Sequence, residues 1–364
     1  MKVLVFAEGN HSTSYWESSL PLLSKRGKSV VFVSLRQRGD VHLNLESRGI
    51  RTFALDSISF KDYWDCAQKL ATIVNDEGIE VVHACEAIPA FVTGLSAFRG
   101  NKAKRIFNRQ HNIVHGKQRV LSFLASHMSD LIMPVSRSSG EAAQKYDFVR
   151  KSKIFVAYSG IESMREVSEM EIVDLRHRLG IGRAAKVVSM VARLREEKGH
   201  RTLFDACKIV ASRLECPLHV VLAGDGPDKM QLMEAASRYD NFDTHFVGSQ
   251  SDVALWFSVG DVVAMPSYHE AFGLSAVEAM SCCRPLVASN VGGLAEIVEN
   301  EISGILVEPR NEKDLAKAIL KILSSNDIAA ELGRMARVRV SRRFSVDRMV
   351  DSWIQCYNFV SGTS

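Results

Sequence analysis

Long hydrophobic runs are missing from this chain of 364 residues. No stretch approaches the roughly 20 apolar residues that a membrane-spanning helix needs. The opening MKVLVFAEGN becomes polar too soon for a secretory signal peptide. These two absences predict a cytoplasmic protein.

Cysteine and net charge are also low. The seven cysteines form no CxxC pair and show no zinc-ligand spacing, so we expect reduced thiols. A formal net charge of +4 is too small to indicate nucleic-acid binding. No GxGxxG follows a predicted strand, which disfavours a nicotinamide-dependent dehydrogenase, and the chain has no DxD triplet to chelate a metal ion.

Acidic residues are absent from Ala87 to Ser129. A segment with charges of one sign is usually a solvated face, but it can also attract phosphates or an anionic membrane surface. A peripheral membrane contact through Arg99 to Arg119 is therefore one hypothesis. The basic residues of the segment are Arg99, Lys102, Lys104, Arg105, Arg109, Lys117 and Arg119.

Short apolar runs rich in β-branched residues alternate with amphipathic helical stretches along the whole chain. This alternation is typical of the α/β class, in which helices cover parallel sheets. Each half of the chain predicts its own doubly wound sheet. The expected strands are residues 2–6, 29–34, 80–85, 105–108, 131–135 and 154–158 in the first half, and 186–192, 218–224, 244–248, 262–266, 285–289 and 304–309 in the second.

The strand pattern stops at residues 159–169, where polar residues precede a new helix. We therefore predict a first domain of residues 1–163 and a second of residues 164–345. The last helix, 346–364, is expected to pack back on the first domain. Ligands of parallel sheets bind at the carboxyl ends of the strands, so a cleft between the two sheets is the expected site.

Cations and glycines follow the first two predicted strands of the second half. Arg193 and Lys198 lie in the loop after residues 186–192 and suit a diphosphate, although two solvated loop cations are the alternative. The turn AGDGPD contains Gly224, which would let a ligand approach the backbone closely. An ordinary tight turn is the alternative there.

The stretch EAFGLSAVE, residues 270–278, places a glutamate on each side of a predicted helix start. The amides of Phe272, Gly273 and Leu274 would have no intrahelical partner and could meet phosphate or hydroxyl groups. Glu270 and Glu278 could each accept hydrogen bonds from adjacent sugar hydroxyls. Capping or ion-pair roles for both glutamates are the alternative.

Two positions of the first half follow predicted strands in the same way. His111 comes after residues 105–108, and Gly9 lies in the loop EGNHSTSYW after the first strand. Both would face a ligand at the carboxyl edge of a parallel sheet. A purely structural histidine is the alternative for His111.

The order and spacing of several motifs resemble the family 4 glycosyltransferases over nearly the whole chain. The matching motifs are ARLREEKG (192–199), LAGDGP (222–227), FVG (246–248), VVAMPSYHEAFGLSAVEAM (262–280), PLVASNVGGLAEIV (285–298) and GILVEP (304–309). The resemblance implies the GT-B fold, two facing Rossmann-like domains, and a retaining sugar transfer from a nucleotide diphosphate sugar. The sequence departs from the family in its first-strand loop, which lacks paired glycines, and at Ser159 and Glu162, where Asn and Asp are more usual.

The resemblance also implies roles for residues. Arg193 and Lys198 would hold the diphosphate, Glu270 the donor sugar and Glu278 the ribose hydroxyls, with no metal and no cofactor beyond the nucleotide sugar. The nucleobase would lie along residues 247–251. The catalytic set is Arg193, Lys198, Glu270 and His111, and the donor-binding set is Gly9, Gly224, Val247, Ser251, Ala271, Phe272, Gly273, Leu274 and Glu278.

The substrates remain open at this point. UDP-glucose is the favoured donor on prevalence, GDP-mannose the second, and the acceptor would be a glycan or a lipid-linked molecule. A nucleotide-sugar 2-epimerase on the same fold is an alternative, since Glu270 and His111 could act as its acid and base. A sugar-nucleotide binding protein without catalysis is another.

Overall fold

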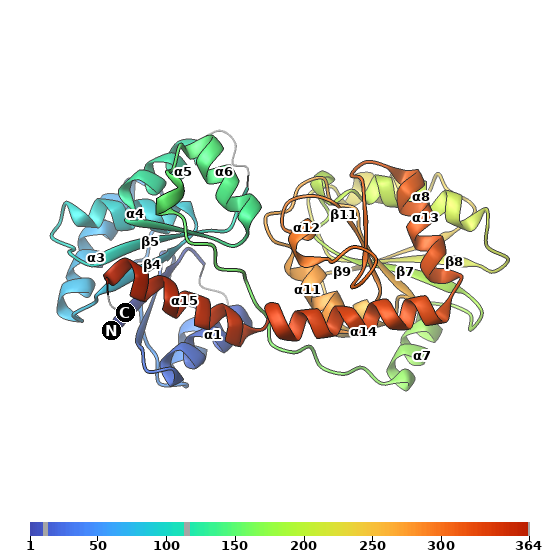
Figure 1. The fold of residues 1–364 in the computed structure, drawn as a ribbon, viewed down its shortest axis with the longest axis horizontal. Coiled ribbons are helices and arrows are strands. Elements are labelled where there is room, and N and C mark those ends of the chain that lie inside the picture. Colours follow the sequence, from blue (N-terminus) through green and yellow to red (C-terminus); the bar gives the residue numbers. More distant parts are fainter. Residues whose placement is uncertain (10–13, 113–116, 363–364) are drawn as a thin grey trace. The chain divides into compact units, whose positions relative to one another are not determined.

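The structure, a computed structural model, describes residues 1–9, 14–112 and 117–362. The chain divides into two compact units, Met1–Glu162 with Ser345–Ser364, and Ser163–Phe344. Each unit contains a six-stranded sheet flanked by helices (Figure 1). The loop residues 10–13 and 113–116, which follow the first and fifth strands, lie outside the described residues.

The first unit has the strand order β3-β2-β1-β4-β5-β6, and all of its strand pairs are parallel. This order is that of the Rossmann fold. Its strands are β1 (Lys2–Ala7), β2 (Ser29–Ser34), β3 (Arg51–Ala54), β4 (Val81–Cys85), β5 (Lys104–Arg109) and β6 (Leu131–Pro134). Its helices are α1 (Ser14–Lys25), α2 (Asp40–Glu46), α3 (Tyr63–Asp76), α4 (Ala87–Ala97), α5 (Lys117–Met128), α6 (Arg137–Asp147) and α15 (Val346–Ser361), with 3₁₀ turns η1 (Phe60–Asp62) and η2 (Lys151–Lys153).

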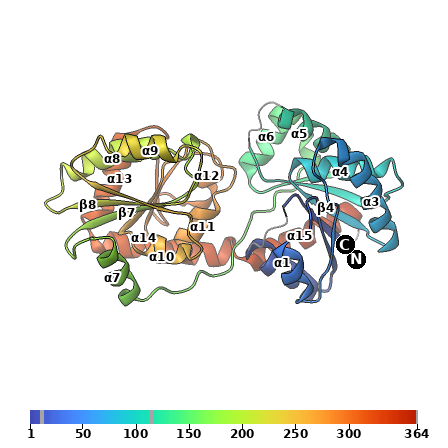
Figure 2. The same ribbon diagram turned by 180° about the vertical axis from the view of Figure 1, so that it is seen from behind.

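The second unit repeats this topology as β12-β11-β10-β7-β8-β9, again with parallel pairs. Helices α8, α9 and α13 cover one face of the sheet, and α7, α10 and α11 cover the other (Figure 2). Its strands are β7 (Lys186–Val191), β8 (Leu218–Ala223), β9 (Asp243–Gly248), β10 (Val262–Met265), β11 (Leu286–Ser289) and β12 (Ile305–Val307). Its helices are α7 (Glu169–Arg178), η3 (Glu196–Lys198), α8 (His200–Ala211), α9 (Lys229–Ala236), α10 (Val253–Ser258), α11 (Leu274–Ser281), α12 (Leu294–Ile297), α13 (Glu312–Leu323) and α14 (Asn326–Arg343).

The final helix α15 packs on the sheet of the first unit, as the sequence predicts. It buries Trp353 and Tyr357 in the same core as β1 and β2. The Tyr357 hydroxyl lies 2.8 Å from Nδ1 of His83 in β4, so the polar end of this buried side chain has a partner. The last residues of the chain thereby complete the first core.

Two strand predictions were wrong. Residues 154–158 form no named strand: Ile154 makes only an isolated bridge to Ile132, although Phe155 and Ala157 donate backbone hydrogen bonds to β6. The pattern missed β3, because RTFA is short and contains two polar residues. A short edge strand carries little of the apolar signal on which such predictions depend.

None of the described helices is long and apolar enough to cross a membrane. All seven cysteines are free thiols, and four of them are buried. The thiols are therefore part of the packed interior or lie near it.

Candidate functional site

Four loops meet at the carboxyl edge of the second sheet, because β10, β7, β8 and β9 are neighbours in that order. Backbone hydrogen bonds join these loops to one another. Leu194 donates to Asp225 O at 3.0 Å, Gly224 to Gly248 O at 2.7 Å, and Tyr268 to Glu197 O at 2.8 Å. The loops therefore form one fixed surface at the point where the strand order reverses, the place where ligands of this topology bind.

Two glycines permit this close approach of the loops. A Cβ on Gly199, which has φ +75°, would lie 2.0 Å from Pro266 O. A Cβ on Gly224, with φ +144°, would lie 1.9 Å from Ala192 O. At Gly224, the backbone of Ala192 already requires a glycine, and the prediction that a ligand also approaches this glycine stays a prediction.

The β7 and β10 loops each bring one charged side chain to the reversal point. Lys198 at the end of η3 and Glu270 between β10 and α11 form an ion pair, with Nζ 2.6 Å from Oε2. The two side chains are only 20% and 14% exposed. Since low solvent exposure strengthens such a pair, each side chain holds the other in place. The structure therefore brings these two predicted residues together.

Arg193 lies in the same β7 loop but behaves differently. Its side chain is exposed. It forms no ion pair with any described carboxylate. Unlike the ammonium of Lys198, the Arg193 guanidinium is therefore not held by a carboxylate of the described residues.

Helix α11 begins at this surface. Its N-cap is Gly273 with φ +112°, and a Cβ there would lie 2.8 Å from Leu294 Cδ2. The amides of Leu274 and Ser275 precede the first bonded amide of the helix, since Ala276 donates to Gly273 O at 3.0 Å, and amides at this position can receive an anion. The Phe272 side chain is buried, with its ring 5.8 Å from that of Phe344, so only the backbone of Phe272 is available to a ligand.

Glu278 lies in the second turn of α11, as predicted, and is partly buried. Its carboxylate has no ion-pair partner among the described residues. Burial raises the pKa of Glu278 above its ordinary value. Hydroxyl donors from a ligand would stabilise its ionised form.

The nucleobase prediction falls on the end of β9 and the loop that follows. Val247 is partly buried and accepts a hydrogen bond from Gln250 Nε2 at 2.6 Å. Ser251 is exposed, and Gly248 turns the chain with φ +73°. Ala271 is partly buried beside Glu270.

Sequence reasoning missed several residues that support this surface. Gly293 donates its amide to Glu270 O at 3.0 Å, and a Cβ there would lie 2.3 Å from Phe272 O. The Tyr268 hydroxyl lies 2.9 Å from Thr202 Oγ1, and the Arg310 guanidinium covers the Tyr268 ring at 3.8 Å. The paired glycines at 292–293 and Tyr268, two positions before Glu270, were the available signals.

His200 is a further buried group next to the β7 loop. It is the first residue of α8 and follows Gly199. Burial lowers its pKa to about 4, and neither ring nitrogen has a hydrogen-bond partner among the described residues. His200 is therefore neutral at pH 7.

In the first unit, His111 and Glu86 lie at the carboxyl edge of the sheet. His111 is 61% exposed, and its Nε2 lies 3.5 Å from Glu86 Oε1. Glu86 directly follows β4 and has φ +73°, a conformation that a residue other than glycine adopts only at a cost. Gly9, after β1, is exposed at the same edge. Sequence reasoning missed Glu86, although its place immediately after a predicted strand was a signal.

The acid-free segment does not form one cationic face, which corrects the sequence interpretation. Arg109 is 2% exposed, forms a buried ion pair with Asp147, and donates to Ser122 Oγ at 2.8 Å. Arg105 is bound by Asp130. The reason is that Lys104 and Arg105 lie at the amino end of β5 and Arg109 at its carboxyl end, so the cations of this strand are on opposite sides of the unit.

The chain is similar in sequence to several known proteins. Residues 173–339 match the family model described as glycosyl transferases group 1. An uncharacterized glycosyltransferase of Methanocaldococcus jannaschii, MJ1607, is 26% identical over 285 residues, 77% of this chain and 71% of that protein. The N-acetyl-alpha-D-glucosaminyl L-malate synthase of Bacillus anthracis is 25% identical over 301 residues, 80% of this chain and 77% of that protein.

Among solved structures, Alr3699/HepE of Anabaena in complex with UDP-glucose matches with a TM-score of 0.83 and 23% identity, over 99% of this chain and 100% of that one. This likeness concerns the fold. Residues 173–339 are thus similar in sequence to the group 1 glycosyl transferases, and the chain, with its two Rossmann-like units, has the GT-B fold.

Proposed function

We propose that the protein transfers a hexosyl group from a nucleotide diphosphate sugar to a hydroxyl of an acceptor, with retention of anomeric configuration. The observation that carries this proposal is the Lys198–Glu270 pair beside the first turn of α11. A fixed cation, a carboxylate and unbonded amides are together what a diphosphate joined to a sugar requires. The order of motifs, which resembles the family 4 glycosyltransferases, favours retention.

Each charged group has a part in binding the donor. Arg193 and Lys198 hold the diphosphate, and Glu270 accepts hydrogen bonds from sugar hydroxyls while it orients Lys198. The α11 amides from Leu274 contribute at the phosphate end. Glu278 accepts from the ribose hydroxyls, and the base lies along residues 247–251.

The chemical step depends on charge that develops on the leaving group. Breaking the anomeric bond transfers negative charge to the diphosphate, and cations near that group stabilise the transition state more than the ground state. The departing phosphate oxygen takes the proton of the acceptor hydroxyl. The proposal includes no metal ion and no cofactor.

The two units have different roles in this proposal. Residues 164–345 bind the donor, and residues 1–163 with helix 346–364 bind the acceptor, a glycan or a lipid-linked molecule in the cytoplasm. The resemblance to family 4 assigns His111, whose Nε2 lies 3.5 Å from Glu86, and Gly9 to the transferred sugar. UDP-glucose is the favoured donor, because a solved structure of similar fold is a complex with UDP-glucose, and GDP-mannose is the second.

Incubation with labelled UDP-glucose and GDP-mannose tests the proposal. Slow release of free sugar and nucleotide, or transfer to an added glycan, is the expected result, and Lys198→Ala should abolish it. An altered sugar still attached to its nucleotide would indicate epimerisation instead. Binding without turnover under all acceptor conditions would contradict the assignment as a transferase.

A further inference from the structure

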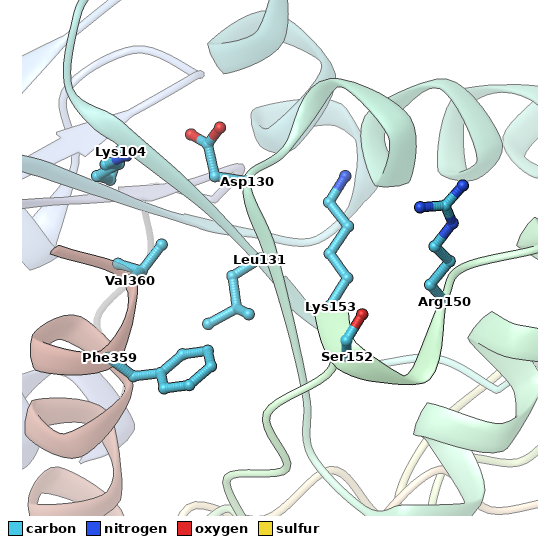
Figure 3. A pocket seen from close by; sticks show the side chains of 8 residues that line it. All are labelled: Lys104, Asp130, Leu131, Arg150, Ser152, Lys153, Phe359 and Val360. Carbon is cyan, nitrogen blue, oxygen red and sulfur yellow. The ribbon is translucent and has the colours of Figure 1, made fainter. Parts of the chain in front are cut away.

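A basic depression lies at the amino edge of the first sheet, where β5 and β6 begin, on the opposite edge from Gly9, Glu86 and His111. Its volume is about 430 Å³, enough for a small ligand. Segments far apart in the sequence meet there (Figure 3). The lining residues are Lys104, Asp130, Leu131, Arg150, Ser152, Lys153, Phe359 and Val360.

The one carboxylate of this depression is already neutralised. Asp130 accepts hydrogen bonds from Arg105 Nε at 3.1 Å, Arg105 Nη2 at 3.0 Å and the Arg105 amide at 2.8 Å. These hydrogen bonds oppose the effect of burial, and the pKa of Asp130 lies below its ordinary value. Asp130 therefore remains ionised and engaged with Arg105.

The three remaining cations of the depression form no ion pair with any described carboxylate. Arg150 and Lys153 extend in the same direction from the η2 turn (Figure 3), while Lys104 begins β5. Lys153 is partly buried and donates to Ser126 O at 3.1 Å. Burial lowers the pKa of Lys153, and the nearby Asp130 carboxylate partly opposes this effect. An anion in the depression would therefore meet cations that no carboxylate of the described residues pairs.

The opposite wall of the depression is apolar. The Phe359 ring is 61% exposed. Its centroid lies 6.0 Å from that of the partly buried Phe155. Val360 and the buried Leu131 continue this wall. A ligand would therefore have an anionic end among the cations and an apolar part against Phe359.

We propose that this depression binds a phosphate group that carries an apolar substituent. Phosphate suits the site, because an arginine fork and two lysine ammonium groups are its usual ligands in proteins. Such a group is found in a phospholipid headgroup and in a soluble phosphorylated compound. The site is separate from the donor-binding loops of the second unit, so it goes beyond the proposed function.

The test compares the full-length wild type with Lys104→Gln/Arg150→Gln and with a matched control, Lys25→Gln/Lys61→Gln. All four side chains are exposed residues of the first unit. Titration calorimetry with inorganic phosphate at low salt should show at least about fivefold weaker binding for the first variant only. Phosphate bound at the donor loops contributes equally to all three proteins, and turnover of nucleotide sugar, measured separately, should not change.

Sedimentation with vesicles distinguishes the two sources of phosphate. Binding to phosphatidylglycerol but not phosphatidylcholine vesicles, lost in the Lys104/Arg150 variant, supports a lipid headgroup. Phosphate binding without vesicle binding supports a soluble compound. Equal behaviour of both variants in both assays would overturn the proposal. If the first variant has a lower unfolding midpoint, Arg150→Lys replaces it, and about twofold weaker phosphate binding is then the supporting result.

Discussion

At the scale of single residues, the Lys198–Glu270 pair combines two functions that the sequence assigned separately. The ammonium is oriented by the carboxylate at 2.6 Å, and both groups are largely shielded from water. Fixed charges in such surroundings need little reorganisation when charge develops on a ligand. In the proposed function, the pair would therefore stabilise a transition state with a diphosphate leaving group.

The first prediction concerns this pair. We expect Lys198→Ala or Glu270→Ala to lower turnover at least about 100-fold, on the order of 3 kcal/mol of transition-state stabilisation. Because each side chain holds the other, the double variant should lose much less than the product of the two single effects. Steady-state kinetics with labelled donor measure all three variants.

Lys313→Ala is the matched control, since Lys313 is an exposed lysine of the same unit. Its turnover should equal that of the wild type. Wild-type turnover in both Lys198→Ala and Glu270→Ala would rule out the assigned roles.

The second prediction concerns His200 and pH. Its folded-state pKa of about 4 lies below the ordinary value of 6.5. Between these values the unfolded chain binds a proton that the folded chain does not. The free energy of unfolding is therefore highest above pH 6.5 and falls as the pH decreases to 4, by about 1.4 kcal/mol per pH unit for this group.

Urea unfolding at pH 7, 6, 5 and 4.5 measures this dependence. His200→Asn should reduce the change of unfolding free energy with pH by the share that His200 contributes. His177→Asn, a substitution at an exposed histidine, is the matched control. An identical slope in the wild type and His200→Asn would disprove the assignment.

At the scale of elements, the loops after parallel strands are set by glycines that pack against neighbouring backbone. Gly224 illustrates the effect, because its φ of +144° and its contact with Ala192 O both exclude a side chain. The same sheet edge contains Gly248, whose φ is +73° but whose Cβ would meet no atom within 4 Å. Both glycines have a positive φ, but only at Gly224 would a side chain also collide with the backbone. Comparing the two positions therefore distinguishes the cost of the collision from the cost of the backbone conformation.

The third prediction uses this contrast. Gly224→Ala should lower the free energy of unfolding by more than about 2 kcal/mol, since the backbone must shift. Gly248→Ala should lower the free energy of unfolding by only about 1 kcal/mol, the cost of placing an alanine in the left-handed conformation. Gly182→Ala, at an open position without positive φ, should cost nothing. Urea unfolding measures the order of the three variants, and equal costs at 224 and 182 would contradict the packing argument.

Strand elements could largely be predicted from the sequence, because buried parallel strands are continuous apolar runs such as SVVFVS. The two wrong predictions lie where this signal fails. Residues 154–158 are apolar because they pack beside β6 without joining it as a strand, and β3 is an edge strand with little burial to reveal it. An apolar sequence indicates that a segment is buried. Whether that segment also pairs as a β-strand depends on the segments beside it in the folded chain.

At the scale of the whole molecule, both units use one topology, and in each the strand order reverses between the first and fourth strands. In the second unit this reversal point contains Lys198 and Glu270. In the first unit it lies between the loops of Gly9 and Glu86. Under the proposed function, a nucleotide should bind at the reversal point of the second unit, beside Lys198 and Glu270, and should stabilise the folded chain from there.

The fourth prediction follows from this assignment. UDP at about 100 times its Kd should add about 2.7 kcal/mol to the free energy of unfolding by mass action, and raise the unfolding midpoint accordingly. Arg193→Ala/Lys198→Ala should lose most of this shift, while Lys104→Gln/Arg150→Gln should retain it. Thermal-shift titration provides the measurement. An undiminished shift in the Arg193/Lys198 variant would place the nucleotide elsewhere.

The sequence by itself determined the α/β class, the parallel sheets, the packing of the last helix and the positions of Lys198, Glu270 and α11, because hydrophobic periodicity and strand-end polarity are local signals. Only the tertiary structure decided which charges are paired. It placed Arg109 in the interior with Asp147, joined Lys198 to Glu270 across 72 positions, and gathered Lys104, Arg150 and Phe359 into one depression. Such contacts depend on how strands are ordered in a sheet, and a linear pattern of residues does not contain that order.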